Sequence, residues 1–153
     1  VTVMERTNAR YLKPEDLPDK PTLSVMDVSF ISITKILPAA AAIMGEEGAF
    51  ISLIKPQFEA GRDRVGKKGV VRDARVHRDV IVEILHFIEQ EMGWAAQALS
   101  FSPIKGPEGN IEFLVYILPK SRATHSVTEA ESKLWCSRHT RACVMHRPEE
   151  VPA

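Results

Sequence analysis

The chain lacks an excess of charge of either sign, because 20 lysines and arginines balance 20 aspartates and glutamates. Any binding to nucleic acid would therefore need a local basic patch rather than attraction by the whole molecule. It also lacks a hydrophobic run of membrane-spanning length, since residues 39–44 and 49–54 are the longest. Its only cysteines, Cys136 and Cys143, argue against a disulfide framework. With no charged and then apolar leader, we expect a soluble, cytoplasmic protein.

The sequence carries enough apolar residues for one domain with a sizeable core, at 153 residues and 44% hydrophobic content. Apolar runs with strand character alternate with helical patterns, and we find no internal repeat. The expected strands are Val1–Met4, Leu23–Met26, Ala49–Ile54, Trp94–Phe101 and Ile111–Leu118. An opening strand without a partner before it suggests a truncated fold.

Two helices are expected between these strands. The first covers residues 33–45, with Ser32 able to cap it and Pro38 expected to kink it if that proline lies beyond the first turn. The second begins after Asp73 and ends at Gly93, and its apolar residues recur at the helical spacing of three and four. The last two strands are joined by a loop without a helix, which favours antiparallel pairing. The pattern predicts an α/β fold, the later portion of a doubly wound parallel sheet with an antiparallel edge strand.

Polar and ionisable residues follow the apolar runs in four stretches. They are Asp-Val-Ser-Phe-Ile-Ser at 27–32, Ile-Lys-Pro-Gln-Phe-Glu at 54–59, Gly-Val-Val-Arg-Asp at 69–73 and Gly-Pro-Glu-Gly-Asn-Ile-Glu-Phe at 106–113. In this order and at these spacings they resemble the second half of the TlyA-type, FtsJ-like ribosomal-RNA 2′-O-methyltransferases, a family also called hemolysins. The resemblance covers about residues 1–118. It implies a partial Rossmann-like methyltransferase domain over 1–119 and an extension of unknown role over 120–153.

Asp27 and Lys55 each follow an apolar strand, and Glu112 precedes the last one. Ligands of open α/β sheets bind outside the carboxyl ends of the strands, so we expect these three side chains to converge at one rim. Burial or nearby cations make a lysine ammonium easier to deprotonate, whereas neighbouring carboxylates favour its charged form. A structural ion-pair cluster is the alternative. The resemblance implies Lys55 as the base, Asp27 as its orienting partner and Glu112 as a hydrogen-bond acceptor for the ribose.

The resemblance also implies S-adenosylmethionine as cofactor, with Asn8, Asp27 and Phe30 near it, and ribosomal RNA as partner. Stacking and core packing both remain open for Phe30, while core packing is expected for Phe58. The family's glycine-rich donor-binding segment and its second, upstream lysine have no match here. We therefore expect a fragment that is inactive alone, completed by the missing N-terminal half or assembled as a homo-oligomer. The alternative is a non-catalytic interaction module or a hemolysin-like protein, although no amphipathic basic helix favours lysis.

A long connection between residues 56 and 73 is rich in basic side chains and in glycine. Such loops often close over substrates, and its cations are candidates for contacts with RNA phosphates, although solvated loop charges are the simpler interpretation. The candidate RNA-binding residues are Arg62, Arg64, Lys67, Lys68 and Arg72.

The tail contains a series of residue types that bind metals: Cys136, His139, Cys143 and His146. Only three residues separate its two halves, which is too tight for the ligand pairs of structural zinc sites. We therefore expect no metal site, and instead an extension that Trp135 anchors to the body.

Overall fold

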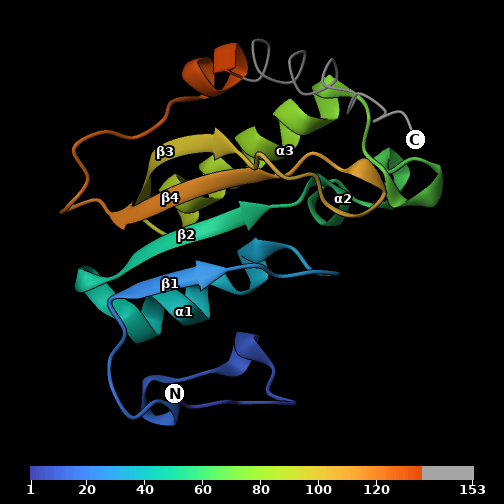
Figure 1. Cartoon of the computed structure of the whole chain (residues 1–153). Coiled ribbons are helices and arrows are strands. Elements are labelled where there is room, and N and C mark those ends of the chain that lie inside the picture. The colour runs from blue at the N-terminus through green and yellow to red at the C-terminus, as the bar shows by residue number, and fades with distance from the viewer. Residues whose placement is uncertain (136–153) are drawn as a thin grey trace, which may run out of the picture.

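A computed structural model describes residues 1–135 of the chain (Figure 1). Its strands are β1 (Leu23–Met26), β2 (Ala49–Ile54), β3 (Trp94–Phe101) and β4 (Phe113–Pro119). Its α-helices are α1 (Leu37–Met44), α2 (Pro56–Glu59) and α3 (Ala74–His86), and short 3₁₀ turns fill several connections. The sequence predicted every one of these strands to within two residues at each end.

The four strands form one sheet in the order β1-β2-β4-β3. β1 and β2 run parallel, while β4 runs antiparallel to both of its neighbours, β2 and β3. Helices connect the strands that point the same way, and a loop without a long helix joins β3 to β4. The expected α/β class is confirmed, with β1 and β2 as the parallel pair, while the antiparallel strand β4 lies between β2 and β3 and leaves β3 at the edge.

One face of the sheet holds the core. Cross-strand neighbours Phe50, Ile117 and Ala96 are fully buried there, and α1 and α3 lie together on this side (Figure 1). Side chains alternate between faces along a strand, so the next row points to the other side. That row includes Val25, 74% exposed, and Ile51, 38% exposed. We call the side that presents Leu23, Val25 and Ile51 the open face.

The first predicted helix is divided into a 3₁₀ turn, Ile33–Lys35, and α1. The Ser32 hydroxyl accepts the Thr34 N–H and so caps the turn, as expected. Pro38 lies in the first turn of α1, where its missing N–H breaks no helical hydrogen bond, and it therefore does not kink the helix.

The second predicted helix is α3, with Asp73 as its N-cap accepting the Arg75 N–H at 2.8 Å. A π turn, Phe87–Glu91, extends it toward Gly93, whose φ of 70° permits the sharp change of direction into β3. The buried face of this helix and its extension comprises His77, Val80, Ile81, Ile84, Leu85 and Ile88.

The expectation of a strand at Val1–Met4 is wrong. These residues have no strand assignment and are exposed, Val3 to 73%. A strand is stable only when a neighbouring strand takes up its backbone hydrogen bonds, and within residues 1–135 the sheet begins at β1. The adjoining turn, Ala9–Tyr11, packs instead against α1.

The segment after β4 returns along the sheet and ends in helical residues 129–135. The Val127 N–H donates to the Ala96 carbonyl on β3 at 2.8 Å. Trp135 then packs its ring against Phe101 and Phe113, with centroids 6.1 and 5.9 Å apart, which is the anchoring role expected for it. The cysteine and histidine series from 136 onward lies outside the described residues.

Candidate active site

Lys55 and Asp27 meet at the carboxyl ends of β2 and β1. The Lys55 ammonium forms an ion pair with the Asp27 carboxylate and donates to the Ser29 hydroxyl at 3.2 Å. Parallel pairing brings these strand ends together, because Met26 on β1 is registered with Ser52 on β2. Lys55 is only 8% exposed, whereas the Asp27 side chain is 66% exposed.

Glu112 reaches the same rim from the opposite direction. β4 is antiparallel to β2, and the pairing of Ile54 with Phe113 places the residues next to them, Lys55 and Glu112, at one edge. Glu112 is 7% exposed and accepts a hydrogen bond from the Gln57 side-chain amide at 3.2 Å. The structure therefore brings the three predicted groups to one rim of the sheet. Lys55 and Glu112 line the same cavity, together with Gln57 and Ser29, whereas Asp27 lines a separate one.

A cavity of about 260 Å³ lies at this rim. Its lining mixes charged, amide and aromatic side chains, which is the composition expected of a site that orients a polar ligand. We define this central cavity by Lys55, Gln57, Phe58, Lys68, Asn110 and Glu112. A second cavity of about 300 Å³ contains Asp27 in its lining, and we call it the flank cavity. Its lining includes Ala9, Leu12, Asp27, Val28 and Ile36.

Two phenylalanines stand at the central cavity. Phe30 is 90% exposed, and its ring centroid lies 5.0 Å from that of Phe58. Phe58 is half-buried and lines the cavity, so the expectation that it packs in the core is wrong. A sequence pattern cannot separate the two locations, because α2 is a single turn that buries Pro56 and turns Phe58 outward.

Unusual backbone conformations are concentrated at the same place. Within residues 1–135, four non-glycine residues have positive φ, and Phe30, Lys68 and Glu108 among them line the central cavity. Left-handed backbone costs an ordinary residue about 1 to 2 kcal/mol and persists only where the surroundings impose it. Such strain gathers at functional sites, which supports this cavity as the site.

Two hydrogen bonds fix Glu59, at the end of α2, against the loop after β1. Its carboxylate accepts the Ile33 N–H at 2.9 Å. Burial raises the pKa of the Glu59 carboxyl, while hydrogen bonds from Ser32 and from the Ile33 N–H act in the opposite direction. This contact ties the segment that carries Lys55 to the segment that carries Phe30.

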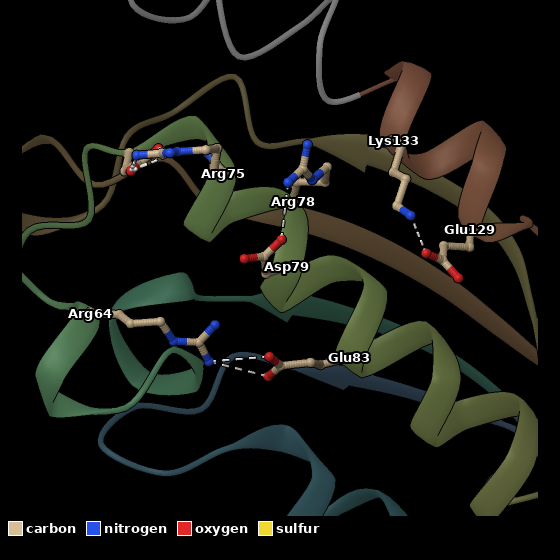
Figure 2. Close-up of polar contacts among 8 residues, drawn as sticks. Arg64, Arg75, Arg78, Asp79, Glu83, Glu129 and Lys133 are labelled. Carbon is tan, nitrogen blue, oxygen red and sulfur yellow. Dashed lines mark hydrogen bonds and ion pairs between the residues drawn. The ribbon is translucent and has the colours of Figure 1, made fainter.

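The basic residues of the loop at 56–73 divide between the cavity and the surface. Lys68 lines the central cavity, and Arg62 lines an adjoining open groove of about 580 Å³. Arg64 turns away to α3, where its guanidinium lies 3.2 Å from the Glu83 carboxylate (Figure 2). Lys67 and Arg72 are exposed. Of the five predicted RNA contacts, Lys68 and Arg62 thus line the cavity or its groove, and Arg64 is engaged by a carboxylate of α3.

Asn8 is an exposed turn residue whose side-chain oxygen accepts the Arg10 N–H at 3.2 Å. Its neighbours Ala9 and Leu12, rather than Asn8 itself, line the flank cavity beside Asp27.

Two further features bear on the kind of site. Residues 1–135 contain no group of three or more histidine, cysteine, aspartate or glutamate side chains placed to hold a metal ion. Within the same residues, no helix combines the length and the apolar character that a membrane crossing requires.

Residues 1–117 match the model of the FtsJ-like methyltransferase family. YqxC of Bacillus subtilis strain 168, a proposed rRNA methyltransferase, is 44% identical over 146 residues, covering 88% of this chain and 52% of YqxC. The 16S/23S rRNA (cytidine-2′-O)-methyltransferase TlyA of Mycobacterium tuberculosis strain H37Rv is 38% identical over 117 residues, covering 76% of this chain and 43% of TlyA.

The fold agrees with these sequence matches. The solved structure of a proposed hemolysin from Streptococcus thermophilus superposes with a TM-score of 0.81 at 36% identity, covering 92% of this chain and 50% of that one. The chain thus spans about half the length of the relatives that it matches. On the family match and the relatives together, this chain belongs to the FtsJ-like methyltransferases.

Proposed function

We propose that this chain supplies the catalytic residues of an S-adenosylmethionine-dependent ribosomal-RNA 2′-O-methyltransferase. The observation that carries the proposal is a buried lysine, Lys55, that is paired with Asp27 and opens into the same cavity as Glu112. The names of the TlyA relatives support the RNA substrate and the 2′-oxygen as the methylated atom. A ribosomal substrate would place the protein in the cytoplasm.

The reaction requires removal of a proton from a weakly acidic ribose hydroxyl. Lys55, in its neutral form, accepts that proton. The Asp27 and Ser29 oxygens hold the Lys55 nitrogen at the carboxyl end of β2. Glu112 accepts a hydrogen bond from the ribose, while Gln57 fixes the orientation of its carboxylate. When bound, the donor supplies an electrophilic methyl group on a positively charged sulfur.

The remaining groups of the site recognise the RNA. The exposed ring of Phe30 and the half-buried ring of Phe58 offer a stacking surface for an unpaired base. Lys68, Arg62, Lys67 and Arg72 are available to phosphates around the central cavity. Arg64 contributes less, because its guanidinium is paired with Glu83.

The residues present fit part of the methyl donor. The flank cavity combines an apolar lining, suited to a flat adenine ring, with the Asp27 carboxylate, which can accept hydrogen bonds from amino or hydroxyl groups. Phe30 stands on the neighbouring loop, whereas the Asn8 side-chain oxygen is already bonded to Arg10. We therefore propose that this chain by itself binds the donor weakly and is inactive alone.

The open face is the surface that would receive the rest of such an enzyme. Parallel strands are normally covered on both faces, yet Leu23, Val25 and Ile51 are exposed and the outer edge of β1 is unpaired within residues 1–135. We propose that further polypeptide, with a strand for β1 and helices for the open face, completes the site. Self-association through this face is the homo-oligomeric alternative.

A non-catalytic interaction module is the second candidate, and the same exposed apolar face favours it. The two functions differ in what the chain does with RNA. A module that uses only the open face would bind a protein partner and ignore a ribose 2′-hydroxyl, whereas the methyltransferase requires RNA to enter the central cavity.

Calorimetric titration with S-adenosylmethionine, followed by a ribosomal-RNA 2′-O-methylation assay, tests the proposal. We expect at most weak donor binding and no transfer by the chain alone, and transfer when the rest of the methyltransferase domain is supplied. Donor binding with a micromolar Kd would contradict the proposed dependence on further polypeptide. Failure of the completed enzyme to methylate RNA would contradict the function itself.

A further inference from the structure

Asn110 is a buried amide whose side-chain oxygen and nitrogen both form hydrogen bonds with backbone groups. It is 4% exposed. Its side-chain oxygen accepts the Val71 N–H at 3.1 Å, and its side-chain nitrogen donates to the carbonyls of Gly69 at 3.0 Å and Pro107 at 3.1 Å. Gly69 and Val71 lie 41 and 39 residues earlier in the chain. One side chain therefore joins the end of the basic loop to the loop between β3 and β4.

The two segments that Asn110 joins are both held in left-handed backbone. Lys68, with φ of 68°, directly precedes Gly69, and Glu108, with φ of 57°, directly follows Pro107. Because such conformations are unfavourable for lysine and glutamate, a compensating interaction has to hold them. The amide bonds to the carbonyl on one side of each strained residue, and both strained side chains line the central cavity.

An asparagine suits this position for a chemical reason. The site needs one acceptor for Val71 and two donors for the carbonyls, which a single primary amide supplies. Aspartate has nearly the same shape but only accepts, so it would keep the Val71 contact and lose both donations. It would also place a negative charge against two carbonyl oxygens in a buried position.

We propose that Asn110 is a positioning residue for RNA binding, which acts by holding Lys68 at the central cavity. The inference rests on the proposed function, since it assigns to Lys68 the binding of an RNA phosphate beside the methylated ribose. The backbone of Asn110 also stabilises the loop between β3 and β4, because its carbonyl accepts the Gly106 N–H at 2.9 Å. Glu112 follows two residues later. Neither Asn110 nor its link to Lys68 follows from the pairing of the strands.

The test compares Asn110→Asp with the unchanged chain by two measurements. Hydrogen exchange monitored by mass spectrometry reports on the loops, and fluorescence anisotropy reports binding to a single-stranded RNA oligonucleotide. We expect faster exchange in residues 66–71 and 106–112, unchanged exchange in α3, and a loss of RNA affinity on the order of tenfold. Unchanged exchange in the two loops would overturn the proposal whatever the RNA result.

A double-mutant cycle separates positioning from general destabilisation. If Asn110 acts through Lys68, then Asn110→Asp combined with Lys68→Ala should bind RNA no more weakly than the worse single variant. Lys133→Ala is the matched control, because Lys133 is paired with Glu129 (Figure 2) and neither residue lines the central cavity. Its effect on RNA affinity should add to that of Asn110→Asp. Additive losses for Asn110 and Lys68 would overturn the positioning role. Absence of RNA binding by the unchanged chain would instead overturn the role of Lys68 in RNA binding, while hydrogen exchange still decides whether Asn110 holds the loops and methylation by the completed enzyme decides the proposed function.

Discussion

Two sets of residues line the central cavity, which we call its first and second walls, and different interactions hold them. The first carries Lys55, with Asp27 behind it, at the ends of β1 and β2. The second carries Lys68 and Glu108 on two loops that contain left-handed residues, and the Asn110 amide bonds those loops to each other. A sheet distributes its register over many backbone hydrogen bonds, whereas the loop wall depends on a few side chains. We therefore expect the first wall to keep its geometry after single substitutions and the second to lose it.

The largest effect is expected from Lys55→Met, which removes the proposed base from the first wall. Methyl transfer by the completed enzyme should fall to background, while β1 and β2 remain paired and donor binding is retained. Quantification of 2′-O-methylated RNA and calorimetry measure the two quantities. The matched control is Lys35→Met, because Lys35 is exposed on the 3₁₀ turn after Ser32. Transfer that survives in Lys55→Met would exclude this lysine as the base.

Gly106→Ala should displace Glu112 without straining the backbone. The φ of Gly106, −70°, suits alanine, but the new Cβ would clash with the Glu112 carboxylate. Glu112 would have to leave its hydrogen bond with Gln57, and we expect roughly a hundredfold loss of methyl transfer. Gly93→Ala is the contrasting variant, because the φ of Gly93 is 70° and its new Cβ would meet no other side chain or backbone segment within 4 Å. It should lower thermal stability and leave transfer unchanged, and the reverse pattern would refute the assignment of Glu112.

Phe30→Ala should weaken RNA binding by about tenfold to a hundredfold, because stacking on one aromatic ring contributes about 1 to 3 kcal/mol per base. Thermal stability should hardly change, since the Phe30 side chain is 90% exposed. Fluorescence anisotropy and thermal unfolding measure the two effects. Tyr11→Ala, at a residue that is 69% exposed, is an aromatic control away from the central cavity, and equal losses for both variants would argue against stacking by Phe30.

The basic loop offers a comparison of two cations only four residues apart. Lys68→Ala should reduce RNA affinity and flatten its dependence on salt, because one phosphate contact is lost. Arg64→Ala should change both quantities less, since its guanidinium is paired with Glu83. A salt titration of RNA binding measures the slopes, and a steeper loss for Arg64→Ala than for Lys68→Ala would reverse the proposed order.

The smallest expected effect is a loss of stability at low pH. It involves His77, which contacts Val71, the residue bonded to Asn110. His77 is buried, and its Nε2 atom lies 3.0 Å from the Val71 carbonyl. Burial lowers the pKa of His77 from its ordinary value of 6.5, and the hydrogen bond to Val71 only partly opposes this. The unfolded chain therefore binds the proton more tightly, so stability is intact above about pH 6.5 and declines as the pH falls below it.

Urea unfolding between pH 7.5 and 5 checks this expectation. His77→Gln should remove the part of the pH dependence that belongs to His77, although it lowers stability at neutral pH by disturbing the packing against Phe113. An unchanged slope between pH 6.5 and 5 in that variant would show that other groups cause the decline.

Most of the first wall could be predicted from the sequence. The apolar runs gave β1 and β2, and parallel pairing then placed Asp27 and Lys55 together without further information. Glu112 followed from the antiparallel direction of β4. The family resemblance supplied the roles of these residues, while the strand pattern supplied their proximity.

The second wall could not be predicted in the same way. Its geometry depends on the rotamer of one buried amide, Asn110, and on left-handed residues such as Lys68, for which lysine carries no sequence signal. Arg64 illustrates the same difficulty, because loop charges pair with whichever partner is near, here Glu83 on α3. Val1–Met4 had a strand pattern but found no strand to pair with in residues 1–135.

The place of β4 in the sheet has a consequence for biosynthesis. Within residues 1–135, β4 is the last strand in sequence, yet it lies between β2 and β3, where Phe50 pairs with Ile117 across 67 positions. As the chain leaves the ribosome, the edges of β2 and β3 that later pair with β4 have no strand partner for their backbone hydrogen bonds until residue 119 is available. Such late, long-range closure slows folding and leaves strands open to wrong partners. The same step brings Glu112 to Lys55, so the proposed active site cannot form before the sheet closes.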